Sequence, residues 1–126
     1  MAGPQRPSSK ELAGKLKEAK VLLCEQPGLF AEPVKAVGEF MELGIGDTAE
    51  VWPLIVKLLD EITPSAYTGG RPPQKSYEKQ IEGVELFAFS WASTHLSRKM
   101  YLKFALKGGR FYYVSLHKDR PHQSRR

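Results

Sequence analysis

The sequence predicts an α+β domain, in which an N-terminal segment of three helices packs on a small C-terminal antiparallel meander of about three strands. Apolar residues recur at helical spacing across residues 9–62 and alternate with polar residues across residues 84–118. A loop rich in glycine and proline, residues 63–76, separates the two patterns. With 126 residues in all, we expect one domain over residues 8–118, a flexible leader over 1–7 and a basic tail over 119–126.

The first helix is expected from about Ser9 to Gln26. Ser8 and Glu11 have the spacing of a capping box just before it. Its apolar residues form one stripe, made of Leu12, Leu16, Ala19 and Leu23. Cys24 is the only cysteine, so it forms no internal disulfide and matches no metal-binding pattern. Because it follows three apolar residues, it is expected to be a small core residue.

Two further helices are expected before the loop. The second runs from about Ala31 to Leu43 and ends at Gly44. Asp47 and Glu50 then repeat the capping-box spacing ahead of the third helix, which carries Pro53 near its first turn. The inward faces are expected to comprise Val34, Val37, Phe40 and Met41 in the second helix, and Val51, Leu54, Ile55, Leu58 and Leu59 in the third.

Three strands are expected after the loop, over residues 84–91, 100–106 and 111–117. With the helices on one face of this meander, the opposite face is open to solvent. The residues expected to face the helices are Leu102, Phe104, Leu106, Val114 and Leu116.

The turn between the last two strands decides which residues share the open face. A two-residue turn, Gly108-Gly109, would pair Lys103 with Val114 and mix polar with apolar residues. A three-residue turn ending at Arg110 keeps the faces separate, so we prefer it. It places Tyr101 opposite His117 and Lys103 opposite Ser115, with Tyr113 adjacent on the same open face.

This cluster has the chemistry that metal-free RNA cleavage requires. The imidazole of His117 can exchange a proton, Lys103 can offset charge on a phosphate, and Tyr101 can position a nucleotide. The same residue types are also ordinary on a solvated sheet face, and that alternative stays open. The sequence has no glycine-rich phosphate loop before a helix, no HExxH and no G-x-S-x-G, so we expect neither a metal nor a cofactor.

Charge is distributed unevenly along the chain. Residues 1–94 hold 10 Lys/Arg and 13 Asp/Glu, whereas residues 95–126 hold 9 Lys/Arg and one acid, Asp119. The net charges of −3 and +8 favour RNA as a partner of the C-terminal third, and a solubilising basic tail is the alternative. No apolar run approaches the roughly 20 residues of a membrane span, and residues 1–10 lack the apolar core of a signal peptide. We therefore expect a cytoplasmic protein with no membrane partner.

The order of three motifs resembles the MqsR family of mRNA interferase toxins, in the RelE-like group of type II toxin–antitoxin systems. "ELGI" at residues 42–45 is similar to the family's E-L-G-L at a helix end. "MYLKFAL" at 100–106 is similar to its V-Y-L-K strand, and "YVSLHK" at 113–118 to its last strand, I-V-S-F-K. The match spans residues 31–118.

The resemblance implies sequence-selective RNA cleavage that a cognate antitoxin blocks. It assigns the family's strand tyrosine to Tyr101 and its terminal lysine to His117. A family lysine aligns with Thr68 and a family glutamine near Ala88, so two polar groups are missing. Arg71 or Lys75 is a candidate substitute for the lysine.

The sequence as a whole predicts a toxin-like, metal-independent endoribonuclease with His117, Lys103 and Tyr101 as catalytic residues. The residues expected to bind RNA are Arg98, Arg110, Tyr113, Lys118 and Arg71. The alternatives are a non-catalytic module of the same shape that binds RNA or protein, and an unrelated small α+β protein.

Overall fold

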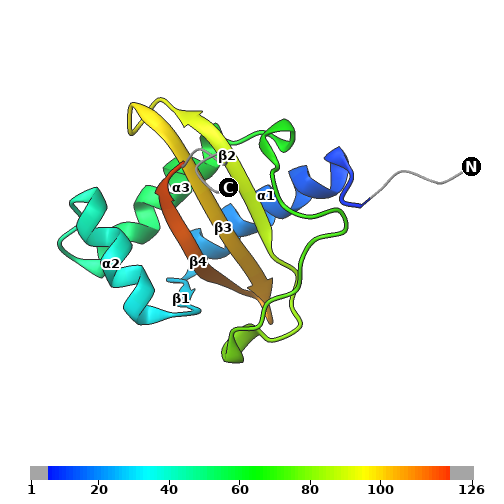
Figure 1. Ribbon diagram of the computed structural model, residues 1–126, viewed down its shortest axis with the longest axis horizontal. Helices are drawn as coiled ribbons and strands as arrows, with labels where there is room; N and C mark the ends of the chain where they lie inside the picture. The colour runs from blue at the N-terminus through cyan, green and yellow to red at the C-terminus, as the bar shows by residue number, and fades with distance from the viewer. Residues whose placement is uncertain (1–5, 120–126) are drawn as a thin grey trace, which may run out of the picture.

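Within the described residues, three α-helices lie in the N-terminal part, the last three strands follow them, and a short strand between the first two helices completes a four-stranded mixed sheet, which confirms the α+β class (Figure 1). The computed structural model of the chain describes residues 6–119. The predicted antiparallel meander is present, and a short strand that was not predicted pairs in parallel with its last member. The helices are α1 (Ser9–Glu25), α2 (Pro33–Leu43) and α3 (Val51–Glu61), and the strands are β1 (Leu29–Phe30), β2 (Phe87–Ser93), β3 (Arg98–Lys107) and β4 (Arg110–Lys118), in the sheet order β1-β4-β3-β2.

The helix ends follow the predicted caps. The Ser8 hydroxyl accepts a hydrogen bond from the Glu11 backbone N–H, and Gly44 ends α2 with a φ of 77°. The four predicted residues of the α1 stripe are all buried. Cys24, however, is exposed, so its predicted burial is wrong. It lies one position beyond Leu23, about 100° around the helix from the buried stripe.

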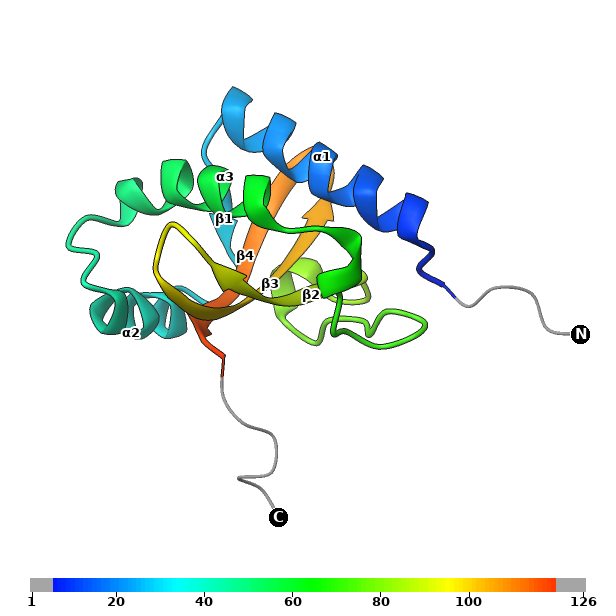
Figure 2. The ribbon, with the colours of Figure 1, turned by 90° about the horizontal axis from the view of Figure 1, so that it is seen from above.

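The helices do not all cover the same face of the sheet. Figure 2 shows α1 and α3 above one face, whereas α2 lies beside β4 at the edge of the sheet. The predicted inward face of α2 is therefore wrong for Val34, Val37 and Met41, which are 88%, 48% and 75% exposed. The residues that α2 buries are Ala36, Glu39 and Phe40.

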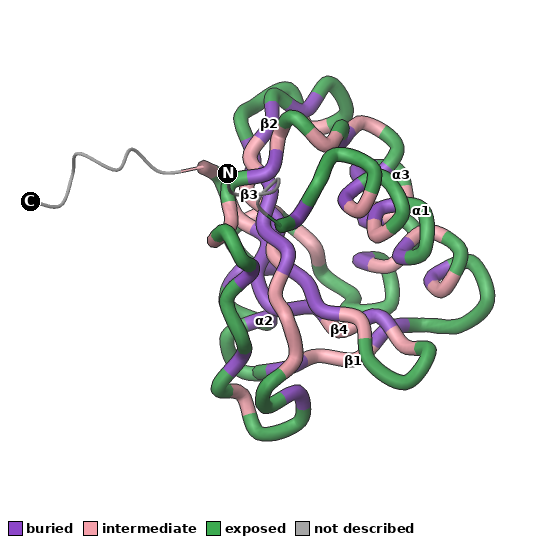
Figure 3. The backbone as a smooth tube through the Cα atoms, turned by 90° about the vertical axis from the view of Figure 1, so that its right-hand side faces the viewer, coloured by how far each residue is buried: buried purple, intermediate pink, exposed green. Residues whose placement is uncertain are grey.

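An aromatic cluster joins α2, α3 and the sheet on the helical side. Phe30 of β1 stacks on Trp52 with ring centroids 4.9 Å apart, and its edge meets Phe40 and Tyr113. Phe104 and Phe111 stack at 5.1 Å in the same core. Figure 3 shows buried residues along the backbone of β3 and β4.

The β3–β4 register combines a tight turn with a bulge. Lys107 pairs with Arg110 across a two-residue turn, in which Gly108 and Gly109 have φ of 57° and 75°. The predicted three-residue turn is therefore wrong. The register then shifts between Lys103 and Phe104, because β4 contributes one extra residue, Val114.

The bulge changes the faces of residues near the turn from those predicted and leaves the faces of residues beyond it as predicted. Phe104 pairs with Tyr113, so Tyr113 lies in the core instead of on the open face, and Val114 lies on the outer face instead of facing the helices. The predicted faces of both residues are therefore wrong. Leu102 and Leu116 pair and face the helices as predicted, as does Phe104, and Leu106 packs at the margin of the same core. Beyond the bulge, Tyr101 opposes His117 and Lys103 opposes Ser115, as predicted.

The edge of β4 is closed by a side chain of α2. The Glu39 carboxylate accepts hydrogen bonds from the Tyr113 hydroxyl, from Ser115 Oγ at 2.7 Å and from the Leu116 backbone N–H at 2.9 Å. Burial and the bonded carboxylate both raise the pKa of Tyr113. Glu39 therefore continues the edge pairing that β1 provides as far as Tyr113.

The outer face is only partly open, because the long connection between α3 and β2 crosses it. Ile81 is fully buried there with Ala31, Ala105 and Val114. This small second core covers the half of the outer face near the Gly108-Gly109 turn. The other half carries Tyr101 and Lys103, which are neither buried nor fully exposed.

Replacing Glu39 should destabilise the fold strongly. Glu39→Ala leaves three buried donors without an acceptor, which we expect to lower the free energy of unfolding by about 2–4 kcal/mol in urea titrations. Glu18→Ala, at an exposed position of α1, is the control and should change it by less than about 0.5 kcal/mol. Equal effects of the two substitutions would contradict this account of the β4 edge.

Candidate RNA-binding site

The open half of the outer face holds a compact group of three side chains, Tyr101, Lys103 and His117, called here the outer-face cluster. The Tyr101 and His117 rings stack with centroids 4.9 Å apart and planes inclined by 20°. His117 Nδ1 lies 2.7 Å from the Lys118 carbonyl oxygen, which that nitrogen can reach only as a donor. This tautomer leaves Nε2 of a neutral ring as a proton acceptor.

Ser115 does not join the cluster. It is 2% exposed and donates its hydroxyl proton to Glu39. Its side chain therefore belongs to the edge of β4.

Two hollows meet at Lys103. The first, of about 300 Å³, lies over Tyr101 and is called here the Tyr101 hollow. The second, of about 530 Å³, extends from Lys103 past Tyr77 and is called the Tyr77 hollow. Gln74, Leu86 and Lys103 line both, so the two hollows adjoin, and together they are called here the groove.

The pKa values of two residues that line the groove, Lys103 and Tyr101, are shifted. Burial lowers the pKa of the Lys103 ammonium, and the nearby charge of Lys35 on α2 lowers it further. Burial raises the pKa of the Tyr101 phenol, with a further contribution from Asp119. A lysine and a tyrosine with perturbed pKa values in one groove are typical of a functional site.

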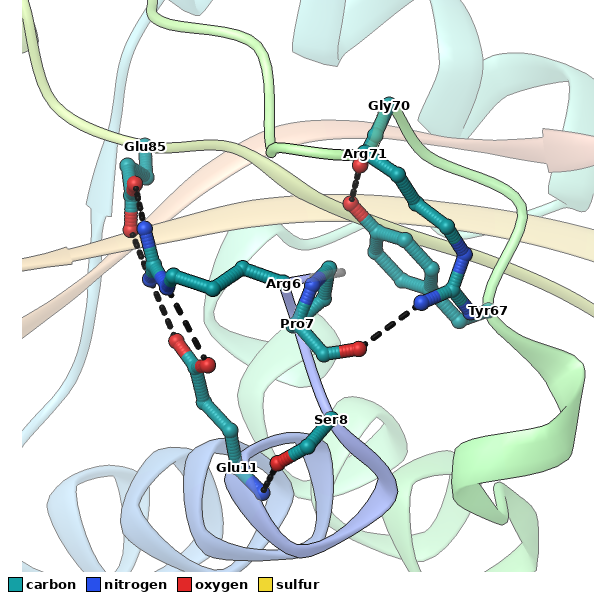
Figure 4. Close-up of polar contacts among 8 residues, drawn as sticks. All are labelled: Arg6, Pro7, Ser8, Glu11, Tyr67, Gly70, Arg71 and Glu85. Carbon is teal, nitrogen blue, oxygen red and sulfur yellow. Dashed lines mark hydrogen bonds and ion pairs between the residues drawn. The ribbon is translucent and has the colours of Figure 1, made fainter. Parts of the chain in front are cut away.

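The N-terminal end of the chain clamps the wall of the groove (Figure 4). The Arg6 guanidinium binds the carboxylates of Glu85 and Glu11, and Arg71 donates to the Pro7 carbonyl at 2.7 Å. The Tyr67 hydroxyl in turn donates to Gly70. Residues 6 and 7 of the predicted flexible leader are thus bonded to the domain, and residues 1–5 lie outside the described chain.

The arginines expected to bind RNA are not gathered around the cluster. Arg110 donates to the Pro27 carbonyl at 2.8 Å and sits seven positions along β4 from His117, a separation of about 23 Å. Arg71 stacks over the Tyr67 ring at 5.0 Å and is directed toward the N-terminal segment. Arg98 lies at the cluster's end of β3, but alternation places it on the side of Met100.

The two other residues expected to bind RNA differ in accessibility. Lys118 is exposed and pairs with Met100, so it projects to the helical side at the end of the sheet. Tyr113 is 1% exposed and has no surface on which a base could stack.

One basic residue near the cluster and several residues of the groove were not predicted from the sequence. Lys99 is exposed and shares the face of Tyr101 by strand alternation, a signal that the sequence already contained. Gln74, Tyr77 and Glu78 come from the long connection, and their position beside Lys103 depends on its path. Of the predicted basic tail, only Asp119 lies within the described residues, where it accepts a bond from Ser90.

The chain matches no protein-family model, no curated protein and no solved structure. None of the helices among residues 6–119 has the length and apolar character needed to cross a bilayer.

Breaking the N-terminal clamp should loosen the wall of the groove without unfolding the domain. In Arg6→Ala we expect faster hydrogen exchange at the amides of Ser76 and Leu86, which bond within the connection at 2.9 and 2.7 Å. Global stability should change little, because the Arg6 ion pairs are exposed. Arg98→Ala, an exposed arginine outside the clamp, is the control. Unchanged exchange at both amides in Arg6→Ala would refute the clamp.

Lys103 should destabilise the fold at neutral pH. Because burial lowers its pKa below the usual 10.5, Lys103→Met should melt at a higher temperature than the wild type at pH 7. The folded state holds this proton less tightly than the unfolded state does. The wild type should therefore recover stability relative to the variant as pH rises through the lowered pKa toward 10.5. A difference in melting temperature that does not vary over this range would contradict the assignment.

Proposed function

We propose that this protein is a toxin-like, metal-independent endoribonuclease that binds RNA along the groove and cleaves it at the outer-face cluster. One observation carries the proposal. Four positions that the family resemblance singles out converge, because Thr68, Ala88 and Tyr101 line one hollow and His117 stacks on Tyr101. These positions come from three strands and a loop, and Lys103 lies in the same hollow.

The proposed chemistry is attack of the ribose 2′-oxygen on the adjacent phosphorus. A new 2′ P–O bond forms, the 5′ P–O bond breaks, and the products are a 2′,3′-cyclic phosphate and a 5′-hydroxyl. His117 Nε2 takes the 2′-hydroxyl proton, and water supplies a proton to the departing 5′-oxygen. Lys103 offsets the charge that develops on the phosphate, and Tyr101 positions the nucleotide.

A role in the cytoplasm, with RNA as substrate and a cognate antitoxin as protein partner, follows from this proposal. The net charge of +8 over residues 95–126 supports an RNA partner. Lys99, which is exposed and shares the face of Tyr101, extends the basic character beyond the cluster.

A second candidate is a module of the same shape that binds RNA without cleaving it. The observation that favours it is that Thr68 and Ala88 have short side chains, whereas the family has lysine and glutamine, two long polar side chains, at these positions. Gln74 lines the same hollow as Ala88 and is placed to supply an amide in its stead.

Cleavage by wild-type protein and variants separates the two candidates. His117→Ala should lower the rate of RNA cleavage by about 10²–10⁴-fold, because one proton-transfer group is lost. Its melting temperature should stay near that of the wild type, since the side chain is only partly buried. The rates are measured on purified protein with labelled mRNA, with and without ribosomes.

His95→Ala is the matched control, because His95 is an exposed histidine in the β2–β3 turn. It should cleave at the wild-type rate. Wild-type cleavage by His117→Ala would overturn the catalytic assignment. An inactive wild type that still binds RNA would favour the non-catalytic module.

A further inference from the structure

The Tyr77 hollow is lined by an aromatic side chain, that of Tyr77, which is almost fully exposed to solvent. Tyr77 is 96% exposed, although a ring of this size normally gains stability from burial. It lines the hollow beside Lys103, at the end of the groove away from Tyr101. Among residues 6–119, no contact explains why an aromatic residue occupies this position.

The backbone around Tyr77 is rigidly placed. Ser76 is 3% exposed, and its backbone N–H and C=O bond to Val84 and Gly83, each at 2.9 Å. Its hydroxyl accepts the Glu78 backbone N–H at 2.9 Å and donates to the Glu78 carboxylate. The ring is therefore presented by a fixed turn, which is the arrangement that lowers the entropy cost of binding.

The charges around the hollow separate a phosphate end from a base end. Lys103 supplies a cation at the junction of the two hollows. The Tyr77 side is lined by two carboxylates, Glu78 and Glu82, and by one further cation, Lys75, so the carboxylates outnumber the cation there. Carboxylates repel phosphate but accept hydrogen bonds from amino groups. A nucleotide would thus place its phosphate at Lys103 and its base between the two carboxylates and Tyr77.

We propose that the Tyr77 hollow is a nucleobase subsite, in which Tyr77 stacks on the base and Glu78 and Glu82 select bases that carry an exocyclic amino group. The volume of about 530 Å³ lies in the range of roughly 300–1,000 Å³ that is usual for ligand pockets. Cytosine, adenine and guanine present an amino group to the carboxylates, whereas uracil presents two carbonyl oxygens and one imide N–H. The inference rests on the proposed function only in taking RNA as the ligand.

Binding of short RNAs that cannot be cleaved tests the subsite separately from catalysis. Fluorescein-labelled 2′-O-methyl hexamers of C, A or U lack the 2′-hydroxyl, and their affinities are measured by anisotropy at about 50 mM salt, where phosphate contacts are strong. The wild type should bind the C and A hexamers more tightly than the U hexamer. Tyr77→Ala should weaken binding of the C hexamer by about 5- to 150-fold, the value of one base–aromatic stack, whereas Tyr77→Phe should retain it.

The carboxylates are tested by a variant of their own, because uracil also stacks less well than the other bases. Glu82→Gln can donate as well as accept, so it should narrow the preference for C over U while leaving affinity for C within a few-fold. Met41→Ala removes a 75% exposed apolar side chain from α2 and should leave all affinities unchanged.

The outcomes distinguish the subsite from the nuclease. Wild-type affinity in Tyr77→Ala, or an unaltered C-over-U preference in Glu82→Gln, overturns the subsite even if RNA is cleaved. The expected binding pattern without any cleavage supports the subsite and overturns the nuclease. Failure of the wild type to bind any hexamer overturns the subsite, whereas the nuclease is decided by the cleavage assay.

Discussion

The Glu39 carboxylate, buried against β4 where that strand bulges, is the constraint on which the two faces of the sheet depend. It accepts from the Tyr113 hydroxyl, Ser115 Oγ and the Leu116 N–H, and so bonds to residues on both faces and to the backbone between them. Buried donors must find acceptors, since an unsatisfied one costs about 1–3 kcal/mol. Glu39 therefore fixes α2 at the sheet edge and leaves the outer face uncovered beyond the bulge.

Two features of the uncovered half of that face are unfavourable for the stability of the fold. Lys103 is partly desolvated, with a lowered pKa and a second lysine nearby, and Tyr77 is kept in water by a well-bonded turn. Neither arrangement benefits the isolated domain, and both are adjacent in one groove. Functional sites are commonly maintained at such a cost to stability. Their coincidence is the physical reason for proposing that RNA binds in this groove and not at the exposed apolar residues of α2.

The sequence predicted the features that local chemistry controls. Ser8, the α1 stripe and Gly44 behave as predicted, and Tyr101 opposes His117 because a two-residue turn plus one bulged residue gives the same distal register as a three-residue turn. The α2 orientation was not predictable from periodicity, because its apolar residues Val34 and Met41 face water while Glu39 is buried. The groove wall escaped prediction because its path depends on contacts distant in sequence, such as Arg6 with Glu85.

The central claim is that RNA is engaged at the outer face beyond the bulge, and mapping its contacts by NMR tests this most directly. Titration with 2′-O-methylated CpA, which cannot be cleaved, is read as amide chemical-shift changes and should affect residues 101–103 and 115–117 and the groove wall at residues 74–83. The account predicts that these changes disappear together in Lys103→Met, which removes the cation at the junction of the hollows. Changes confined to the Arg110 turn or to the exposed face of α2 would contradict it.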